Sequence, residues 1–155
     1  GRYENVAEQK NYGIELELTY QSNKWRIESN YAYTKGKTRS TYSESGNLLV
    51  KDTVYNSLYR VPGSAINLFI DHTVSKKISW NILAKYVGER LEPVYAAAPA
   101  KLSDYLTIDI SGQYRFTQNA FGFISLKNIT NTKYFDVLGY NSRKFNFTSG
   151  LNFSL

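Results

Sequence analysis

Lys144-Phe-Asn-Phe-Thr-Ser-Gly-Leu-Asn-Phe-Ser-Leu155 alternates between apolar and polar residues up to the last position of the chain. From Phe145 onward the odd positions are apolar except for Ser149, and the even positions are polar or glycine. Successive side chains of an extended strand point to opposite faces, so a period of two gives one apolar and one polar face. The stretch is therefore predicted to be a β-strand. A soluble sheet would show the same pattern, so this strand alone leaves the surroundings of its apolar face open.

Similar alternation recurs along the chain. It is visible in residues 12–20, 25–34, 66–71, 78–87 and 106–116. In residues 121–129 both parities carry apolar side chains, a pattern that predicts a bulge or a change of phase. Together with the closing stretch, the sequence predicts about seven strands. Their connections alternate in length: short polar turns lie near 21–24, 75–77 and 117–119, and long ones span 35–59, 89–103 and 130–143. This asymmetry is typical of outer-membrane barrels.

Aromatic residues stand near the ends of the predicted apolar faces. From Trp25 to Tyr33 a strand would rise ~26 Å at about 3.3 Å per residue. At a tilt of about 40° that is ~20 Å along the membrane normal, comparable to the ~25 Å apolar band of an outer-membrane barrel. We therefore expect an aromatic girdle at the lipid–water interface, formed by Trp25, Tyr33, Trp80, Tyr86 and Tyr114.

Composition excludes several classes of protein. No apolar run approaches the ~18 to 20 residues that a membrane-spanning helix needs. The net charge of +6 would permit a nucleic-acid partner. The basic residues, however, are spread over loops and turns, without a basic helix or an RNA-binding aromatic motif. We expect no nucleic acid partner, and we interpret these charges as solvated or facing lipopolysaccharide.

The sequence gives no sign of an enzyme. The single histidine, His72, has nothing to pair with, so an interfacial or lumenal polar role is expected rather than a metal site. No nucleophile elbow, phosphate-binding loop or ligand-spaced Cys/His set occurs. Several carboxylates fall on faces predicted to point into a barrel lumen, where charged rows are ordinary. They are Glu15, Glu17, Glu28, Asp71 and Asp109.

Several segments resemble the C-terminal part of the β-barrel of TonB-dependent outer-membrane receptors. Asn128-Ile-Thr-Asn-Thr-Lys-Tyr134 is similar to the Asn-Leu/Ile-Thr/Asp-Asn/Asp-x-x-Tyr turn of that family, and Gly139-Tyr-Asn-Ser-Arg143 to its Gly-Tyr loop with an arginine. The alternating last strand follows in the same order. Near the other terminus, Tyr3-Glu-Asn-Val6 and Gly13-Ile-Glu-Leu-Glu-Leu18 resemble a segment leading from an outer loop into a strand.

The resemblance implies an all-β fold: an antiparallel transmembrane β-barrel segment of about seven C-terminal strands from a 22-stranded barrel. Short turns would be periplasmic, long loops extracellular, and the C-terminus periplasmic, in the cell outer membrane. Residues 1–155 would be the C-terminal portion of the barrel, with the plug domain and earlier strands absent. No leader precedes Gly1, so we expect a processed, excised or partly represented polypeptide.

The same resemblance implies a part in nutrient uptake, with a siderophore, haem, cobalamin or oligosaccharide as substrate, and no cofactor. A membrane barrel must close to leave no unsatisfied edge in lipid. The expected partners are therefore the remainder of its own barrel and plug, the TonB system through the absent N-terminal part, the barrel-assembly machinery, and outer-membrane lipid with lipopolysaccharide.

The closing strand also looks like the signal that the barrel-assembly machinery reads in outer-membrane proteins. The residues expected to form this signal are Phe145, Phe147, Leu151, Phe153 and Leu155. Many such signals end on Phe or Tyr, whereas this chain ends on leucine.

Two alternatives remain open at this stage. One is a different outer-membrane barrel, such as a porin or an autotransporter translocator, which shares the alternation and the loop asymmetry. The other is a soluble β-sandwich that binds carbohydrate through exposed tyrosine and tryptophan, and it predicts apolar faces buried against each other.

Overall fold

The computed structural model describes residues 8–42, 48–94 and 99–154 of the chain. Their secondary structure consists of strands β1 (Glu8–Gln21), β2 (Trp25–Tyr42), β3 (Leu48–Tyr55), β4 (Ser64–Thr73), β5 (Ile78–Val87), β6 (Arg90–Glu92), β7 (Ala100–Leu102), β8 (Tyr105–Arg115), β9 (Ala120–Lys127) and β10 (Asn146–Phe153). Among the described residues, no helix has the length and apolar character needed to cross a membrane.

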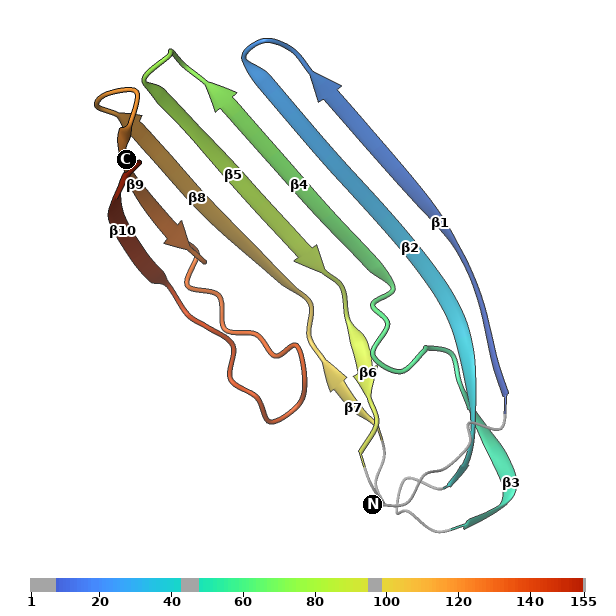
Figure 1. The fold of residues 1–155 in the computed structure, drawn as a ribbon. Helices are drawn as coiled ribbons and strands as arrows, with labels where there is room; N and C mark the ends of the chain where they lie inside the picture. The colour runs from blue at the N-terminus through green and yellow to red at the C-terminus, as the bar shows by residue number, and fades with distance from the viewer. Residues whose placement is uncertain (1–7, 43–47, 95–98, 155) are drawn as a thin grey trace.

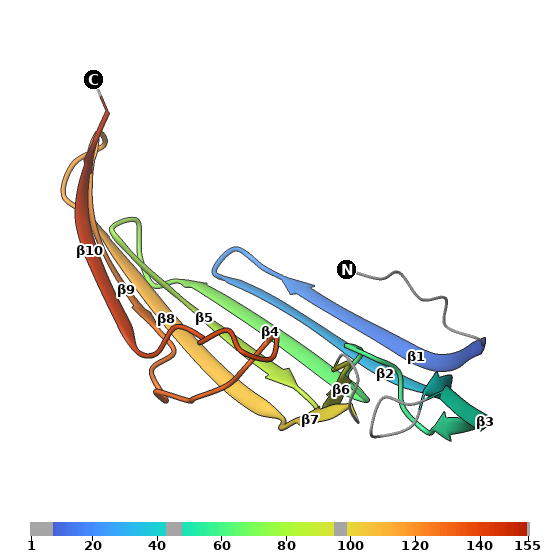
Figure 2. The ribbon, with the colours of Figure 1, turned by 90° about the horizontal axis from the view of Figure 1, so that it is seen from below.

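Seven strands form one antiparallel sheet in the order β1-β2-β4-β5-β8-β9-β10 (Figure 1). β3 adds to the sheet by pairing with the extended end of β2, and β6 and β7 form a separate pair. Figure 2 shows the sheet as a single curved layer. The predicted fold, an antiparallel segment of a β-barrel, is confirmed, and so is the order in which the predicted strands follow one another.

The strand register gathers the apolar residues on one face of the sheet. Residues paired across antiparallel strands lie on the same face. Ile27 of β2 pairs with Ile70, Ile70 with Ile82, and Ile82 with Ile110. The apolar side chains of the outer strands remain largely exposed, as the 60% exposure of Leu16 shows. Within the described chain, no second layer covers this face, in contrast to the arrangement expected for a β-sandwich.

The opposite face is polar. All five carboxylates predicted to share it, from Glu15 to Asp109, do so by register. Arg26 forms a 2.7 Å ion pair with Glu28 on this face, and the amide of Asn67 donates a 2.8 Å hydrogen bond to Asn30. Polar side chains thus satisfy one another between neighbouring strands, on the side that a closed barrel would place in its lumen.

The bulge predicted near residues 121–129 was wrong for the strand itself. β9 keeps one continuous register with β8 and with β10 from residue 120 to 127. Phe121 and Phe123 simply lie on the polar face. The ring of Phe123 has room because it lies over Gly150, where an added Cβ would approach the ring to 2.8 Å.

The connection predicted from residue 35 to 59 contains more strand than expected. β2 continues to Tyr42 and pairs with β1 from Glu8 onward. β3 then returns along this extension, with a register shift between Ser40 and Tyr42. Residues 35–42 of β2 are mostly polar on both faces, so hydrophobic alternation gave no strand signal in this extension, although the backbone ladder continues.

The short turns lie at one end of the sheet and the long connections at the other (Figure 1). Two of the short turns use the same local device. The hydroxyl of Ser22 accepts the amide of Trp25 at 3.1 Å, and the hydroxyl of Ser75 accepts the amide of Ile78 at 3.2 Å. Such side-chain bonds stabilise tight turns.

A small core lies at the end with the long connections. Among the described apolar residues, only Leu58, Val87, Leu102 and Tyr105 are fully buried. Leu58 packs against Gly36 of β2, where an added Cβ would come within 2.5 Å of the leucine Cδ2. The glycine is therefore needed for this close approach, and the core holds the connections against the sheet.

Candidate functional site

The predicted girdle residues all lie on the apolar face, and the register divides them into two rows. Trp25 and Trp80 both pair with β4 at His72, and Tyr114 pairs with Ile78, so these three aromatics lie near the short turns. Tyr33 and Tyr86 lie near the long connections. An aromatic girdle requires two such rows, one at each end of the apolar face. The role of these five residues at a membrane interface stays a prediction.

His72 lies in the row near the short turns, on the apolar face and not on the polar one. Its ring stacks on Trp25 with centroids 3.8 Å apart and meets the edge of Trp80 at 5.3 Å. Sequence reasoning missed this contact because the three residues belong to three different strands. Within the described part of the chain, no group of three or more His, Cys, Asp or Glu residues could hold a metal ion.

The predicted assembly strand corresponds to β10, at one edge of the sheet. Phe147, Leu151 and Phe153 project from the apolar face and are exposed, and Phe145 precedes the strand and is exposed as well. Leu155 lies outside the described residues. In the described part of the chain, β10 pairs with β9 alone, so its second edge is open.

A charged cluster occupies the end with the long connections, where β6 meets segments from three parts of the chain. Arg90 and Glu92 are both almost completely buried. The Arg90 guanidinium donates a hydrogen bond to the carbonyl of Phe135 and lies 3.8 Å from Asp136 and 5.6 Å from the Tyr105 ring centroid. Glu92 is paired with Arg60 at 2.6 Å. One arginine thus holds the 128–145 connection, and one carboxylate holds the segment that precedes β4.

Buried polar atoms without partners remain in this cluster. They are Nη1 of Arg90 and Oε2 of Glu92. Because an unpaired buried polar atom is costly, such atoms are natural contacts for water or for a polar ligand. Sequence reasoning did not single out either residue, and the only signal was two charges flanking a leucine inside a presumed loop.

Tyr134, the last residue of the Asn-x-x-x-x-x-Tyr turn, packs on this cluster. Its ring stacks on Tyr105 at 4.1 Å, and the Tyr105 hydroxyl donates a hydrogen bond to Asp136. Burial raises the pKa of Tyr134 above its ordinary value, and the charges of Asp136 and Asp109 raise it further. The phenol therefore stays neutral across the physiological range.

Asn128, the first residue of the same turn, is a buried hub with a left-handed backbone (φ 49°). Its amide nitrogen donates hydrogen bonds to the carbonyls of Thr132 and Arg143, at 2.9 and 3.1 Å. Its side-chain oxygen accepts the backbone N–H of Thr132 at 3.0 Å, and its own N–H donates to Asp109 at 2.7 Å. The motif found in the sequence therefore folds the start of the 128–145 connection.

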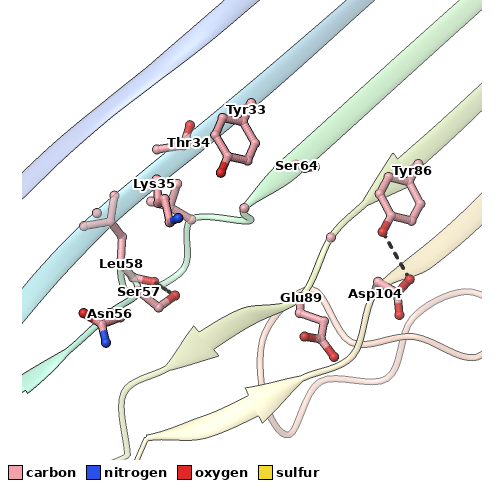
Figure 3. Close-up of a pocket in the computed structure, with 14 residues that line it drawn as sticks. Tyr33, Thr34, Lys35, Asn56, Ser57, Leu58, Ser64, Tyr86, Glu89 and Asp104 are labelled. Atoms are coloured by element: carbon pink, nitrogen blue, oxygen red, sulfur yellow. Dashed lines mark hydrogen bonds between the residues drawn. The ribbon is translucent and has the colours of Figure 1, made fainter.

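A polar cavity of about 470 Å³ lies where β2, β4 and β5 meet the long connections (Figure 3). Tyr33 and Tyr86 form one side, and the Tyr86 hydroxyl lies 3.2 Å from Asp104. Lys35 and Glu89 add charges of opposite sign, of which Glu89 is already paired with a lysine of β7. This arrangement of aromatic rings and charges can bind a polar ligand, and it contains no pairing of a nucleophile with a base.

The architecture defines a class of protein before any comparison. A curved antiparallel sheet with one exposed apolar face, one polar face and connections of two lengths is a section of a membrane β-barrel. The model of the family described as "TonB dependent receptor-like, beta-barrel" matches residues 1–132. The chain belongs to this family of outer-membrane receptors, which are not enzymes, so the porin, autotransporter and sandwich alternatives are set aside. No curated protein sequence matches the chain significantly.

Solved receptor structures share the fold. The ferric-catecholate import receptor Fiu from Escherichia coli K12 is similar to the chain with a TM-score of 0.75 and 19% identity, over 94% of the chain and 21% of Fiu. The pyoverdine outer membrane receptor FpvA from Pseudomonas aeruginosa PAO1 is similar with a TM-score of 0.72 and 15% identity, over 95% of the chain and 22% of FpvA. The siderophore receptor PiuA from Acinetobacter baumannii is similar with a TM-score of 0.70 and 20% identity, over 94% of the chain and 22% of PiuA. The chain thus spans about a fifth of the length of these receptors.

Proposed function

We propose that residues 1–155 form the C-terminal strands of a TonB-dependent receptor that imports a nutrient across the outer membrane, with a plug and earlier strands supplied by the rest of the protein. The family match over residues 1–132 carries this proposal. The open edges of β1 and β10 in the described chain support it, because lipid tolerates only closed barrels.

In the proposed orientation the short turns and the C-terminus face the periplasm, and the long connections face the outside. The apolar face contacts lipid, and lipopolysaccharide surrounds the outer rim. Trp25, Trp80 and Tyr114 then form the periplasmic girdle, and Tyr33 and Tyr86 form the outer one. The clear separation of short and long connections between the two ends of the sheet supports this orientation.

The substrate class that we propose is a ferric siderophore. Fiu, FpvA and PiuA are named as receptors for ferric catecholates, for pyoverdine and for a siderophore. The charged cluster around Arg90 lies at the end of the sheet that the proposed orientation places outside. Uptake would take its energy from the TonB system, through the part of the receptor outside this chain.

Co-refolding tests the barrel assignment. The 155-residue chain is mixed in detergent with the upstream portion of its parent, and folding is followed by circular dichroism and by heat-modifiable gel mobility. We expect the chain alone to stay unfolded or insoluble and the mixture to give a heat-modifiable barrel. A monomeric, cooperatively folding chain in plain buffer would contradict the proposal.

Ligand binding by the complete receptor tests the substrate class. Ferric catecholate, ferric pyoverdine, haem and cobalamin are titrated separately, with quenching of tryptophan fluorescence as the measurement. Saturable binding of a ferric siderophore, and not of the other two, supports the proposal. Binding of haem or cobalamin alone would overturn the siderophore assignment and leave the receptor assignment in place.

A further inference from the structure

The polar cavity beside Tyr33 and Tyr86 lies on the same face of the sheet as the apolar residues. Tyr33 pairs with Ser64, and the N–H of Gly88 donates to the carbonyl of Ser64 at 2.8 Å, so these three residues form one row across β2, β4 and β5. Ser64 and Gly88 carry little or no side chain, which leaves the row hollow next to the tyrosine. The cavity therefore belongs to the surface that a barrel presents to its surroundings.

The cavity marks the outer end of the apolar band. From His72 to Ser64, β4 rises ~26 Å at about 3.3 Å per residue. At a tilt of about 40° that is ~20 Å along the membrane normal, near the upper edge of a ~25 Å apolar band that starts at the row of His72. The next row toward the short turns is apolar again, because Ile66 pairs there with Tyr31 and Tyr86 and is 39% exposed. A polar cavity thus directly adjoins an apolar surface.

The charges around the cavity are divided between two ends (Figure 3). Lys35 lies at the β2 end, and Glu89 and Asp104 lie at the opposite end, beside β5 and β8. Asp104 accepts the Tyr86 hydroxyl at 3.2 Å, and Glu89 is paired with Lys101 at 2.8 Å. Lys35 forms no ion pair within the described residues. Because two carboxylates face the lysine across the cavity, the cavity is not suited to a simple inorganic anion.

Positive charge continues from the cavity along β2. Lys37 lies on the same face as Lys35, two residues farther from the apolar band, and directly opposite Lys10 of β1. Both β2 lysines are exposed, and Lys37, like Lys35, forms no ion pair in the part of the chain that the structure describes. We call Lys35 and Lys37 the lysine pair. It places two uncompensated charges just above the apolar band.

These features complement a phosphorylated sugar that carries acyl chains. Lysine ammonium groups bind phosphate, and carboxylate oxygens accept hydrogen bonds from sugar hydroxyls. Tyrosine offers an apolar ring for the C–H face of a sugar together with a polar hydroxyl. The exposed apolar row at Ile66 continues from the cavity toward the short turns, where acyl chains attached to the sugar would lie. The volume of about 470 Å³ is sufficient for a sugar ring.

We propose that this cavity binds the phosphorylated glucosamine head of one lipopolysaccharide molecule, with a phosphate at the lysine pair and acyl chains along the row of Ile66. The inference rests on the proposed function, because the long connections must lie at the outer leaflet, which consists of lipopolysaccharide. A lysine near a membrane surface favours an anionic lipid by about fivefold. The lysine pair is therefore expected to contribute about 25-fold.

The test uses the complete receptor in phosphatidylcholine nanodiscs that contain three probes in equal amounts. They are bisphosphoryl lipid A, lipid A without phosphates, and phosphatidylglycerol, and native mass spectrometry counts the lipids retained after transfer to detergent. We expect bisphosphoryl lipid A to be preferred over each of the other two by about tenfold or more. Equal retention of the phosphate-free form would overturn the phosphate contact. Equal retention of phosphatidylglycerol would show that the sugar is not recognised, and would overturn the proposal.

One pair of variants tests the charges. Lys35→Gln/Lys37→Gln should lower the retention of bisphosphoryl lipid A by about 25-fold. Its control, Lys76→Gln/Lys77→Gln, removes the same charge at the short turns and should retain the lipid as the wild type does. Equal retention by the two double variants would overturn the role of the lysine pair.

A second pair of variants tests the cavity itself. Ser64→Leu fills the hollow between Tyr33 and Gly88 and should abolish retention of bisphosphoryl lipid A. Ser29→Leu makes the same exchange on the same face, outside the cavity, where Ser29 pairs with Leu68, and should keep the lipid. Equal behaviour of the two serine variants would contradict a site in the cavity.

Heat-modifiable mobility of each sample separates this inference from the proposed function. A folded wild-type barrel that shows no preference among the three probes refutes the lipopolysaccharide site and leaves the receptor assignment intact. A wild-type protein that never forms a heat-modifiable barrel refutes the receptor assignment, and the lipopolysaccharide site with it.

Discussion

The guanidinium of Arg60 lies 2.6 Å (Nη2) and 2.8 Å (Nε) from the same carboxylate oxygen of Glu92. The two side chains differ in surroundings, since that of Glu92 is 4% exposed and that of Arg60 is 64% exposed. Arg60 also has a left-handed backbone (φ 62°), and its N–H donates to the carbonyl of Leu91 at 2.7 Å. The segment before β4 is thus fixed to β6 by backbone and side chain together.

Arg60→Ala should destabilise this attachment by about 1–2 kcal/mol, because the buried carboxylate loses its cation. The measurement is urea unfolding of the complete receptor, together with limited proteolysis of residues 56–63. Arg26→Ala is the control, since its pair with Glu28 is exposed on both sides and should matter by less than about 0.5 kcal/mol. Adding Glu92→Leu to Arg60→Ala should restore part of the loss. If the double variant were no more stable than Arg60→Ala alone, the unpaired carboxylate would not be the cause of the loss.

Asn128→Ala should be more damaging than its place in a connection suggests. It removes a buried side chain that bonds to Thr132 and Arg143, and it places alanine in a left-handed conformation. We expect a loss of about 2–4 kcal/mol in the same unfolding assay. Asn141→Ala, an exposed asparagine of the same connection, should change stability by less than about 0.5 kcal/mol. Equal losses of stability in Asn128→Ala and Asn141→Ala would show that the hydrogen bonds of Asn128 do not stabilise this connection.

A charged side chain placed on the apolar face should prevent folding in lipid, whereas the same side chain at the adjacent position, on the polar face, should be tolerated. Ile82 lies in the middle of that face, opposite Ile70 and Ile110, and Ile82→Arg should cost about 2–4 kcal/mol in a bilayer. Asn81→Arg places the same side chain on the polar face, opposite Asp71, and should be nearly neutral. The yield of the heat-modifiable form in liposomes measures both. Similar yields would mean that the face assignment is wrong.

Sequence alone predicted what depends on local alternation. The strands, their two faces and the alternation of short and long connections follow from periods of two and from turn residues. Contacts between connections did not follow, because Arg90 and Phe135 are 45 residues apart and meet only through the strand order. The register was also needed to bring His72 together with Trp25 and Trp80, which lie on the two neighbouring strands. Within the connections, polar composition hid the extension of β2, and the length of only three residues each hid β6 and β7.

The raised pKa of Tyr134 gives a pH dependence with a definite sign. A phenol whose pKa is higher in the folded state contributes stability that is fully present below about pH 10, its ordinary value. That contribution is lost as the pH rises through the higher folded value. Tyr134→Phe keeps the stacking on Tyr105 and cannot ionise, so its stability should fall less steeply above about pH 10. Urea unfolding at a series of alkaline pH values measures the difference, and parallel curves for both proteins would contradict the prediction.

The closing strand allows a test that separates an assembly signal from ordinary stabilisation. Phe153 projects from the apolar face with 68% exposure, and its neighbour Asn152 projects from the polar face. If the barrel-assembly machinery reads the apolar row, Phe153→Ala should slow assisted folding into proteoliposomes severalfold and should leave spontaneous folding in detergent nearly unchanged. Asn152→Ala should affect neither. The ratio of assisted to spontaneous rates is the decisive quantity, because a residue that only stabilises β10 would change both rates together. A constant ratio across the three proteins would therefore reject the signal and leave a strand that matters only for closing the barrel.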